Sequence, residues 1–206
     1  MNFSTVILAN GIFPTHKIPL SYIINADRII CCDGACANLV NFGFEPYAIV
    51  GDIDSLSDEL ALRYADRIFR DSNQETNDLT KAVNWCISRG FDDIVIVGAT
   101  GKREDHTLGN ISLLAEYCKY ANVMMATDTG IFRVYYSSCE IEIFSGQTVS
   151  IFSIGDDTEI TSTGLKYPLN NTKITNWWTA TLNEALSDRI FLNFKSGRIF
   201  VFLKFK

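Results

Sequence analysis

The sequence predicts two joined modules: an N-terminal doubly wound, mostly parallel α/β domain, followed by a small antiparallel β-sandwich. Three observations indicate this fold class. Short strand-like runs in the first part are apolar throughout, helical periods lie between them, and those helical periods disappear after about residue 130. We therefore expect an α/β domain over residues 1–130 and a sandwich over residues 131–206.

The predicted strands of the first part are rich in Val, Ile and Met and are bounded by turn residues, which is typical of strands buried on both faces of a parallel sheet. They cover residues 5–9, 28–32, 48–50, 94–97 and 122–126. A helix is expected after Asn77, whose side chain suits the N-cap, and it should end near Arg89 and Gly90. Two more helices are expected, one opened by Ser57 and one over 107–119.

The second part contains six short β-rich runs separated by turn signals such as Ser145-Gly146 and Ser196-Gly197. These runs cover residues 131–136, 140–144, 148–153, 159–161, 189–194 and 198–205. So many short strands in about 75 residues favour a small sandwich.

Composition excludes several kinds of partner. The chain has 206 residues with 18 basic and 24 acidic side chains, a net charge of −6, so we expect no nucleic-acid partner. No apolar run reaches about 18 residues, so no membrane span is expected. The six cysteines lie on largely apolar stretches without metal-ligand spacing, so we expect reduced thiols. The N-terminal residues lack the basic segment of a signal peptide, so we expect a cytoplasmic location.

Four polar clusters follow predicted strands or open a predicted helix. They cover residues 33–35, 51–55, 74–78 and 98–106. In open α/β sheets, ligands bind at the carboxyl ends of the strands, so these clusters should meet along one edge of the sheet.

Asp52 and Asp54 are two residues apart, so on an extended backbone both carboxylates would project to the same side. Two adjacent carboxylates suit Mg²⁺, and Asp78 at the start of a helix is a candidate third ligand. The alternative is that these aspartates only cap turns. We favour it less because the other polar clusters are expected at the same edge of the sheet.

The run Gly-Ala-Thr-Gly at 98–101 precedes a helix and offers backbone N–H groups to a phosphate. It is neither a Walker loop nor a dinucleotide fingerprint, and a plain tight turn is an equally good interpretation. Arg103 strengthens the phosphate interpretation because a guanidinium can bind two phosphate oxygens at once. His106 alone is more typical of a structural residue than of a catalyst.

Five motifs follow one another along the chain. They are Cys-Asp-Gly-Ala-Cys-Ala-Asn at 32–38, Gly-Asp-Ile-Asp-Ser at 51–55, the run 74–81, Gly-Lys-Arg-Glu-Asp-His at 101–106, and Gly-Leu-Lys-Tyr-Pro-Leu at 164–169. In this order they resemble the motifs of the thiamin pyrophosphokinase family. The chain departs from the family pattern at Lys102, where the family has a second glycine, and at Leu182, where the family has a serine.

The resemblance implies an α/β nucleotide domain and a thiamin-binding sandwich, assembled as a homodimer. It implies transfer of a diphosphate group from ATP to the hydroxyl of thiamin, which releases AMP, with Mg²⁺ held by Asp52, Asp54 and Asp78. The expected catalytic residues are Asp52, Asp54, Asp78, Arg103 and Asp105. The expected ATP-binding residues are Asp33, Gly34, Asp52, Ser55, Gln74, Thr76, Lys81, Thr100, Gly101, Arg103 and His106. The expected thiamin-binding residues are Asp105, Tyr167, Thr181 and Asn183, with Trp177 and Trp178 as candidate stacking partners.

Two other functions are kept as alternatives. One is a different Mg²⁺-dependent enzyme with an Asp-x-Asp pair, such as an aspartyl phosphatase or a glycosyltransferase. The other is a nucleotide-binding module without turnover. A phosphatase would carry its nucleophilic aspartate after the first strand, whereas this pair follows a later strand.

Overall fold

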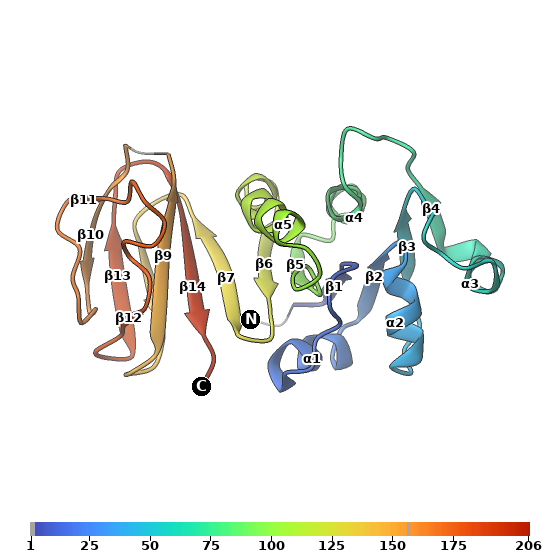
Figure 1. Ribbon diagram of the computed structural model, residues 1–206, viewed down its shortest axis with the longest axis horizontal. Helices are drawn as coiled ribbons and strands as arrows, with labels where there is room; N and C mark the ends of the chain where they lie inside the picture. The colour runs from blue at the N-terminus through green and yellow to red at the C-terminus, as the bar shows by residue number, and fades with distance from the viewer. Residues whose placement is uncertain (1–2, 156) are drawn as a thin grey trace. The chain divides into compact units, whose positions relative to one another are not determined.

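The computed structural model describes residues 3–155 and 157–206. The chain divides into two compact units, Met1–Asp128 and Thr129–Lys206. The fold is mixed α/β: parallel strands with helices make up the first unit, and antiparallel strands make up the second (Figure 1).

The first unit is built on strands in the order β6-β5-β1-β2-β3-β4. Their bounds are β1 Thr5–Leu8, β2 Arg28–Cys32, β3 Ala48–Gly51, β4 Ile68–Arg70, β5 Asp93–Val97 and β6 Asn122–Ala126. Every pairing described among these strands is parallel. The chain moves outward from β1 to β4 and then returns to place β5 on the other side of β1. The strand order therefore reverses between β1 and β5.

Helices cover both faces of this sheet, which confirms the doubly wound arrangement (Figure 1). Helices α4 and α5 lie on one face and α1 and α2 on the other. The helices are α1 Lys17–Ile24, α2 Ala35–Asn41, α3 Asp58–Arg63, the short 3₁₀ helix η1 Ala65–Arg67, α4 Asp78–Ile87 and α5 Glu104–Tyr117.

Helix α4 begins where its sequence predicts, because the side-chain oxygen of Asn77 accepts the Thr80 N–H at 2.9 Å. It buries Leu79, Val83 and Cys86 against the sheet. Helix α5 starts at Glu104, three residues before the predicted start. The difference arises because two acidic residues in the first turn are favourable near the positive end of the helix dipole.

The second unit consists of two antiparallel sheets with the orders β12-β9-β14-β7 and β11-β10-β13-β8. Their strands are β7 Gly130–Tyr135, β8 Cys139–Glu142, β9 Thr148–Ile154, β10 Glu159–Thr163, β11 Thr172–Lys173, β12 Asn183–Glu184, β13 Arg189–Asn193 and β14 Arg198–Lys204.

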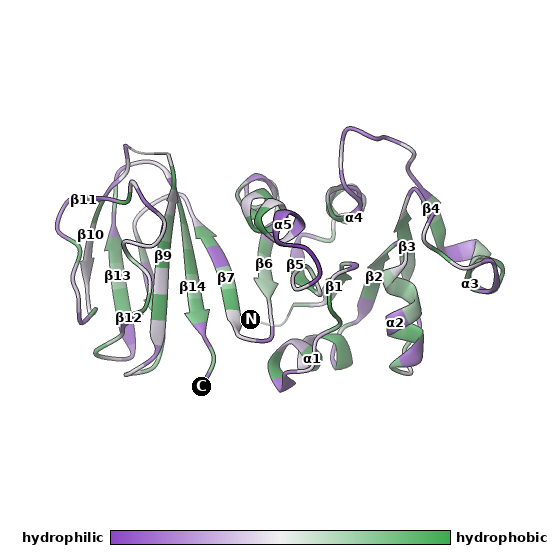
Figure 2. Cartoon of the chain, viewed as in Figure 1, coloured by the Kyte–Doolittle hydropathy of each residue, from purple (hydrophilic) through white to green (hydrophobic). Residues whose placement is uncertain are grey.

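The two sheets share one core, so this unit is a sandwich. Ile190 and Leu192 of β13 alternate with exposed neighbours and lie in the same buried cluster as Ile199 and Val201 of β14. Figure 2 shows the strands of both units as largely hydrophobic.

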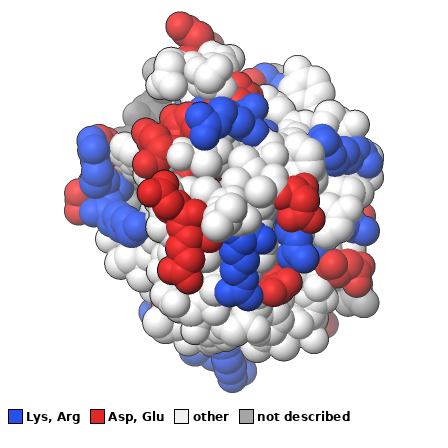
Figure 3. Space-filling view, turned by 90° about the vertical axis from the view of Figure 1, so that its right-hand side faces the viewer, with Lys and Arg blue, Asp and Glu red and all other residues white. Residues whose placement is uncertain are grey.

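No helix in the described part of the chain combines the length and the apolar character needed to cross a membrane. Figure 3 shows acidic and basic side chains interspersed on one face of the molecule, not one continuous basic surface. Ion pairs of the first unit include those of Glu45 with Arg63 and Arg67.

Candidate active site

A cavity of about 440 Å³ in the first unit lies at the point where the strand order reverses. We call it the switch-point pocket. It is lined by Ala9, Asn10, Gly11, Cys32, Asp52, Gln74, Thr76, Asn77, Asp78, Leu79, Lys81, Ala99, Thr100, Lys102, Arg103, His106, Thr107 and Asn110. These residues lie at the carboxyl ends of β1, β2, β3 and β5, in the segment before α4, or on α4 and α5. The carboxyl ends of the strands are where ligands of open α/β sheets bind.

One wall of the pocket forms because the segments after β1 and β5 lie directly against each other. The Gly11 N–H donates to the carbonyl oxygen of Gly98 at 2.6 Å, and the Ile12 N–H donates to that of Thr100 at 2.9 Å. A Cβ atom at Gly11 would lie 2.3 Å from the Gly98 oxygen, so only glycine allows this approach.

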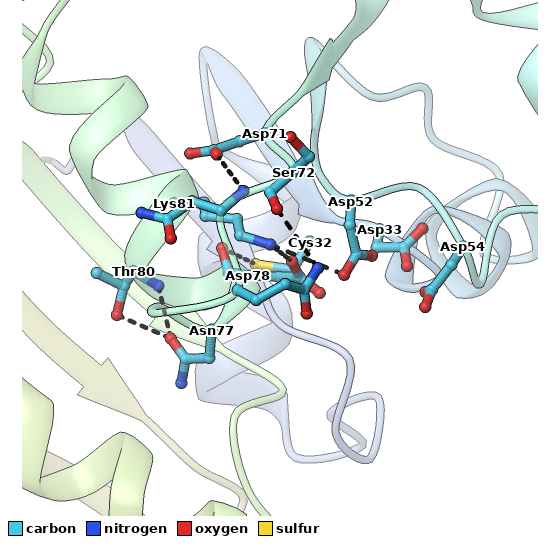
Figure 4. Close-up of polar contacts among 12 residues, drawn as sticks. Cys32, Asp33, Asp52, Asp54, Asp71, Ser72, Asn77, Asp78, Thr80 and Lys81 are labelled. Carbon is cyan, nitrogen blue, oxygen red and sulfur yellow. Dashed lines mark hydrogen bonds and ion pairs between the residues drawn. The ribbon is translucent and has the colours of Figure 1, made fainter.

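Three carboxylates come together at the carboxyl ends of β2 and β3. Asp33, Asp52 and Asp54 each offer an oxygen, and these oxygens all lie within 4.8 Å of one another. Figure 4 shows the Asp33 and Asp52 side chains next to each other, with Asp54 beyond them. One oxygen of Asp33 accepts the Ser55 N–H at 3.0 Å. We call Asp33, Asp52 and Asp54 the carboxylate cluster.

The backbone around the carboxylate cluster is strained. Asp33 has φ +40° and Ile53 has φ +68°, a conformation that is unfavourable for a β-branched residue. The extended backbone expected between Asp52 and Asp54 is therefore wrong. The two carboxylates are close because the chain turns at Ile53, and such strain persists where the surroundings hold it in place.

Asp78 and Lys81 form a second group beside the cluster. The Lys81 ammonium donates to Asp78 Oδ1 at 3.0 Å and lies 3.8 Å from Asp52 Oδ2 (Figure 4). The Lys81 side chain is only 2% exposed. A Cβ atom at Gly51 would lie 3.1 Å from both Asp33 Cβ and Asp78 Oδ1, so the carboxylates pack closely over a residue without a side chain.

The pKa values of this region reflect its burial and its charges. Burial raises the pKa of Asp33, although the Ser55 N–H acts against it. Burial also acts to raise the pKa of Asp52, but hydrogen bonds from Asp54 and the charge of Lys81 lower it on balance. Burial acts to lower the pKa of Lys81, and the hydrogen bond to Asp78 overcomes this and raises it. Lys81 and Asp52 are therefore both held in their charged forms.

Two buried oxygens of the cluster, Asp33 Oδ1 and Asp52 Oδ1, have no hydrogen-bond partner among the described residues. A buried unpaired carboxylate oxygen is costly unless a cation satisfies it. The cluster therefore has the donors and the need for a hard cation such as Mg²⁺. Whereas the sequence predicts Asp52, Asp54 and Asp78 as ligands, the structure groups Asp33 with Asp52 and Asp54 and engages Asp78 with Lys81.

The N-terminal turn of α5 adds an exposed ion pair. Arg103 donates two hydrogen bonds to Asp105, at 3.0 and 2.6 Å. The side-chain hydrogen bond from Arg103 lowers the pKa of Asp105 to about 2. Gly101 lies at the start of this turn, where its N–H donates to Thr107 Oγ1 at 3.4 Å.

The other predicted nucleotide contacts are distributed around the same pocket. Gln74, Thr76, Thr100 and His106 line it. A Cβ atom at Gly34 would lie 3.0 Å from the side-chain nitrogen of Asn10 and 3.1 Å from Ser55 Cβ. Gly34 and Ser55 are therefore packed together beside the cluster.

The predicted thiamin residues Tyr167, Thr181 and Asn183 lie in the second unit, described here by itself. Asn183 Nδ2 donates to the Tyr167 carbonyl oxygen at 2.7 Å, and the Tyr167 N–H donates to Asn183 Oδ1 at 3.1 Å. The Thr181 hydroxyl donates to the Trp178 carbonyl oxygen at 2.8 Å. Leu182 is 76% exposed with φ +56°.

Several residues that line the pocket were not predicted from the sequence as site residues. They include Asn10 and Lys102, whose side chains are hydrogen-bonded to each other. Asp33 was assigned to the nucleotide alone. The signal for Asn10 was its position directly after the first strand, at the point where the strand order reverses.

Comparison with known proteins covers both units. Residues 20–126 match the family model "Thiamin pyrophosphokinase, catalytic domain", and residues 130–202 match "Thiamin pyrophosphokinase, substrate-binding domain". The chain is 31% identical to the thiamine pyrophosphokinase of Bacillus subtilis, over 93% of this chain and 94% of that protein. It is 26% identical to thiamin pyrophosphokinase 1 of Caenorhabditis elegans, over 83% and 76% of the two chains.

Solved structures show the same fold. The crystal structure of the Bacillus subtilis thiamine pyrophosphokinase superposes with a TM-score of 0.81 at 24% identity, covering 97% of this chain and 98% of that one. The yeast thiamin pyrophosphokinase structure gives a TM-score of 0.79 at 19% identity, covering 100% and 87%. The fold is therefore shared over nearly the whole chain.

Proposed function

Because the chain belongs to the thiamin pyrophosphokinase family, we propose that its switch-point pocket is where a diphosphate group passes from ATP to the hydroxyl of thiamin. The protein is a transferase with thiamin pyrophosphokinase activity, and its products are thiamin diphosphate and AMP. The observation that carries the location is the carboxylate cluster, which lies beside the pocket and has two unpaired buried oxygens.

Mg²⁺ is the proposed cofactor, and Asp33, Asp52 and Asp54 are the side chains best arranged to hold it. When bound there, the ion supplies positive charge that offsets the charge of the phosphate oxygens. Asp78 stays a predicted ligand at the edge of this set. Lys81 holds Asp78 and Asp52 in place, which fixes one side of the cluster before any ligand arrives.

Arg103 and Asp105 have separate proposed roles at the start of α5. Arg103 suits phosphate oxygens because its planar guanidinium can donate two parallel hydrogen bonds. Asp105, with its pKa lowered to about 2, is a weak base, so we assign it to orienting the thiamin hydroxyl instead of deprotonating it. For an acceptor that needs little covalent help, correct positioning supplies a large part of the rate.

The two units have different proposed tasks. The first unit binds the nucleotide and carries out the transfer, and the second binds thiamin through Tyr167, Thr181 and Asn183, with Trp177 and Trp178 available to stack on its cationic ring. We further propose that the protein works as a homodimer. Its molar mass in solution, measured by light scattering, tests that proposal.

The activity is tested by incubating the protein with Mg²⁺ and ATP, with and without thiamin, and measuring the products. AMP and thiamin diphosphate that form only when thiamin is present support the proposal. Inorganic phosphate released without thiamin would favour an aspartyl phosphatase. Saturable ATP binding without AMP under any condition would favour a binding module.

A further inference from the structure

The switch-point pocket contains three cationic side chains, and two of them are already paired with carboxylates. Lys81 is buried between Asp78 and Asp52 (Figure 4). Arg103 is held by Asp105 through two hydrogen bonds. The charge of each of these two cations is therefore already partly neutralised by a carboxylate.

Lys102 differs from these two cations. Its ammonium donates to the side-chain oxygen of Asn10 at 3.0 Å, and that oxygen is neutral. Among the residues that the structure describes, Lys102 has no carboxylate within ion-pair distance. The side chain is exposed and lines the pocket, so its charge is both uncompensated and accessible.

The position of Lys102 is set by the fold. It follows β5, whereas Asn10 follows β1, and the hydrogen bond joins residues 92 apart in the chain. The two segments are held together by the backbone contacts of Gly11 and Ile12 with Gly98 and Thr100. The Lys102 ammonium is therefore directed across the point where the strand order reverses.

We propose that Lys102 binds the polyphosphate of the nucleotide, and that Asn10 holds its side chain over the pocket until the nucleotide arrives. On binding, the ammonium exchanges a neutral amide oxygen for a charged phosphate oxygen, which is the stronger hydrogen bond. This inference rests on the proposed function in that it takes a nucleoside triphosphate as the ligand of the pocket.

The balance of charge supports the assignment. Five carboxylates lie in or beside the pocket, whereas only three cations line it. The carboxylates are the three of the carboxylate cluster and those of Asp78 and Asp105. A polyphosphate adds further negative charge, so the one cation without a carboxylate is the one it can recruit at least cost.

The test compares Lys102→Met, which keeps the length of the side chain without its charge, with Lys102→Arg, which keeps the charge. Lys119→Met is the matched control, since Lys119 is an exposed lysine beyond the end of α5 that pairs with Glu116. Binding of Mg²⁺–ATP is measured by titration calorimetry at low and high salt, and KM is measured separately for ATP and thiamin.

We expect Lys102→Met to weaken Mg²⁺–ATP binding about tenfold and to reduce its salt dependence, because an ionic hydrogen bond is lost. Lys102→Arg should restore most of the affinity, the thiamin KM should stay constant, and Lys119→Met should match the wild type. Wild-type affinity and salt dependence in Lys102→Met would overturn the role of Lys102 alone. A wild-type protein that does not bind Mg²⁺–ATP would overturn the proposed function, and this role with it.

Discussion

Replacing Asp54 by asparagine should raise the stability of the metal-free protein while it removes the activity. Asp54 contributes one of three carboxylates whose oxygens lie within 4.8 Å of one another. Asparagine has nearly the same shape and keeps an oxygen that can accept the Ser55 hydroxyl, which now bonds Asp54 at 3.2 Å. The substitution therefore removes mainly one negative charge.

The size of the gain follows from the repulsion between Asp54 and its buried neighbour Asp33. At the 4.8 Å limit the repulsion is about 1 kcal/mol in water and about 3 kcal/mol at an effective dielectric constant of about 20. Asp54 is exposed and Asp33 is buried, so we expect a gain of about 1–2 kcal/mol, or roughly 2–8 °C in melting temperature.

The assay is thermal unfolding in EDTA and again in Mg²⁺. In EDTA, Asp54→Asn should melt above the wild type. In Mg²⁺ the wild type should gain more than the variant, because a ligand stabilises a protein according to its affinity for the folded state. Turnover of the variant should fall by orders of magnitude. The control is Asp92→Asn, an exposed aspartate of the first unit outside the cluster, which should change neither quantity.

Two results would refute this reasoning. If Asp54→Asn melts at or below the wild-type temperature in EDTA, the carboxylates do not repel one another as their spacing implies. If the variant keeps near-normal turnover at saturating Mg²⁺, Asp54 does not hold the metal.

Three further predictions concern single residues. Lys81→Met should lower the free energy of unfolding by about 2 kcal/mol in urea titrations, because Asp78 loses its 3.0 Å partner; a loss no larger than that of the exposed control Lys119→Met would contradict this. The pKa of Asp105 is lowered to about 2, so its contribution to stability is present above its ordinary pKa and is lost only as the pH falls through about 2. Because this pKa lies below the assayed range, Asp105→Asn should reduce kcat without changing the shape of the pH profile of kcat/KM between about pH 5 and 9. If the variant instead loses the acidic limb of that profile, Asp105 is the base. Leu182→Ser should change the KM for thiamin and leave that for ATP constant, and an unchanged thiamin KM would place Leu182 outside the thiamin site.

The elements that could be predicted are those specified by local pattern. A strand such as β2 is a continuous apolar run, and α4 has both a capping residue and one apolar face, so neither needs distant contacts to be identified. Helices α1 and α2 and strand β4 were not predicted. They have eight, seven and three residues, which is too short for a periodic pattern to stand out, and contacts with the sheet complete them.

The residue types of the site could be predicted from the sequence, but which of these residues lie together could not. Asp52 and Asp54 were identified from their spacing, but their closeness depends on the turn at Ile53, whose φ of +68° no propensity scale favours. From the sequence, Lys81 was predicted to bind phosphate. Only the structure shows that its side chain is buried and that its ammonium pairs with Asp78.

By itself, the sequence determined the two modules, most of their strands and the loops that carry the site, because apolar periods and caps act between near neighbours in the chain. Only the tertiary structure decided which distant loops meet. The return of the chain to place β5 beside β1 brings Lys102 to Asn10, and the ends of β2 and β3 bring Asp33 to Asp52 and Asp54. Strand order is set by the packing of the whole sheet, and no local stretch of residues encodes it.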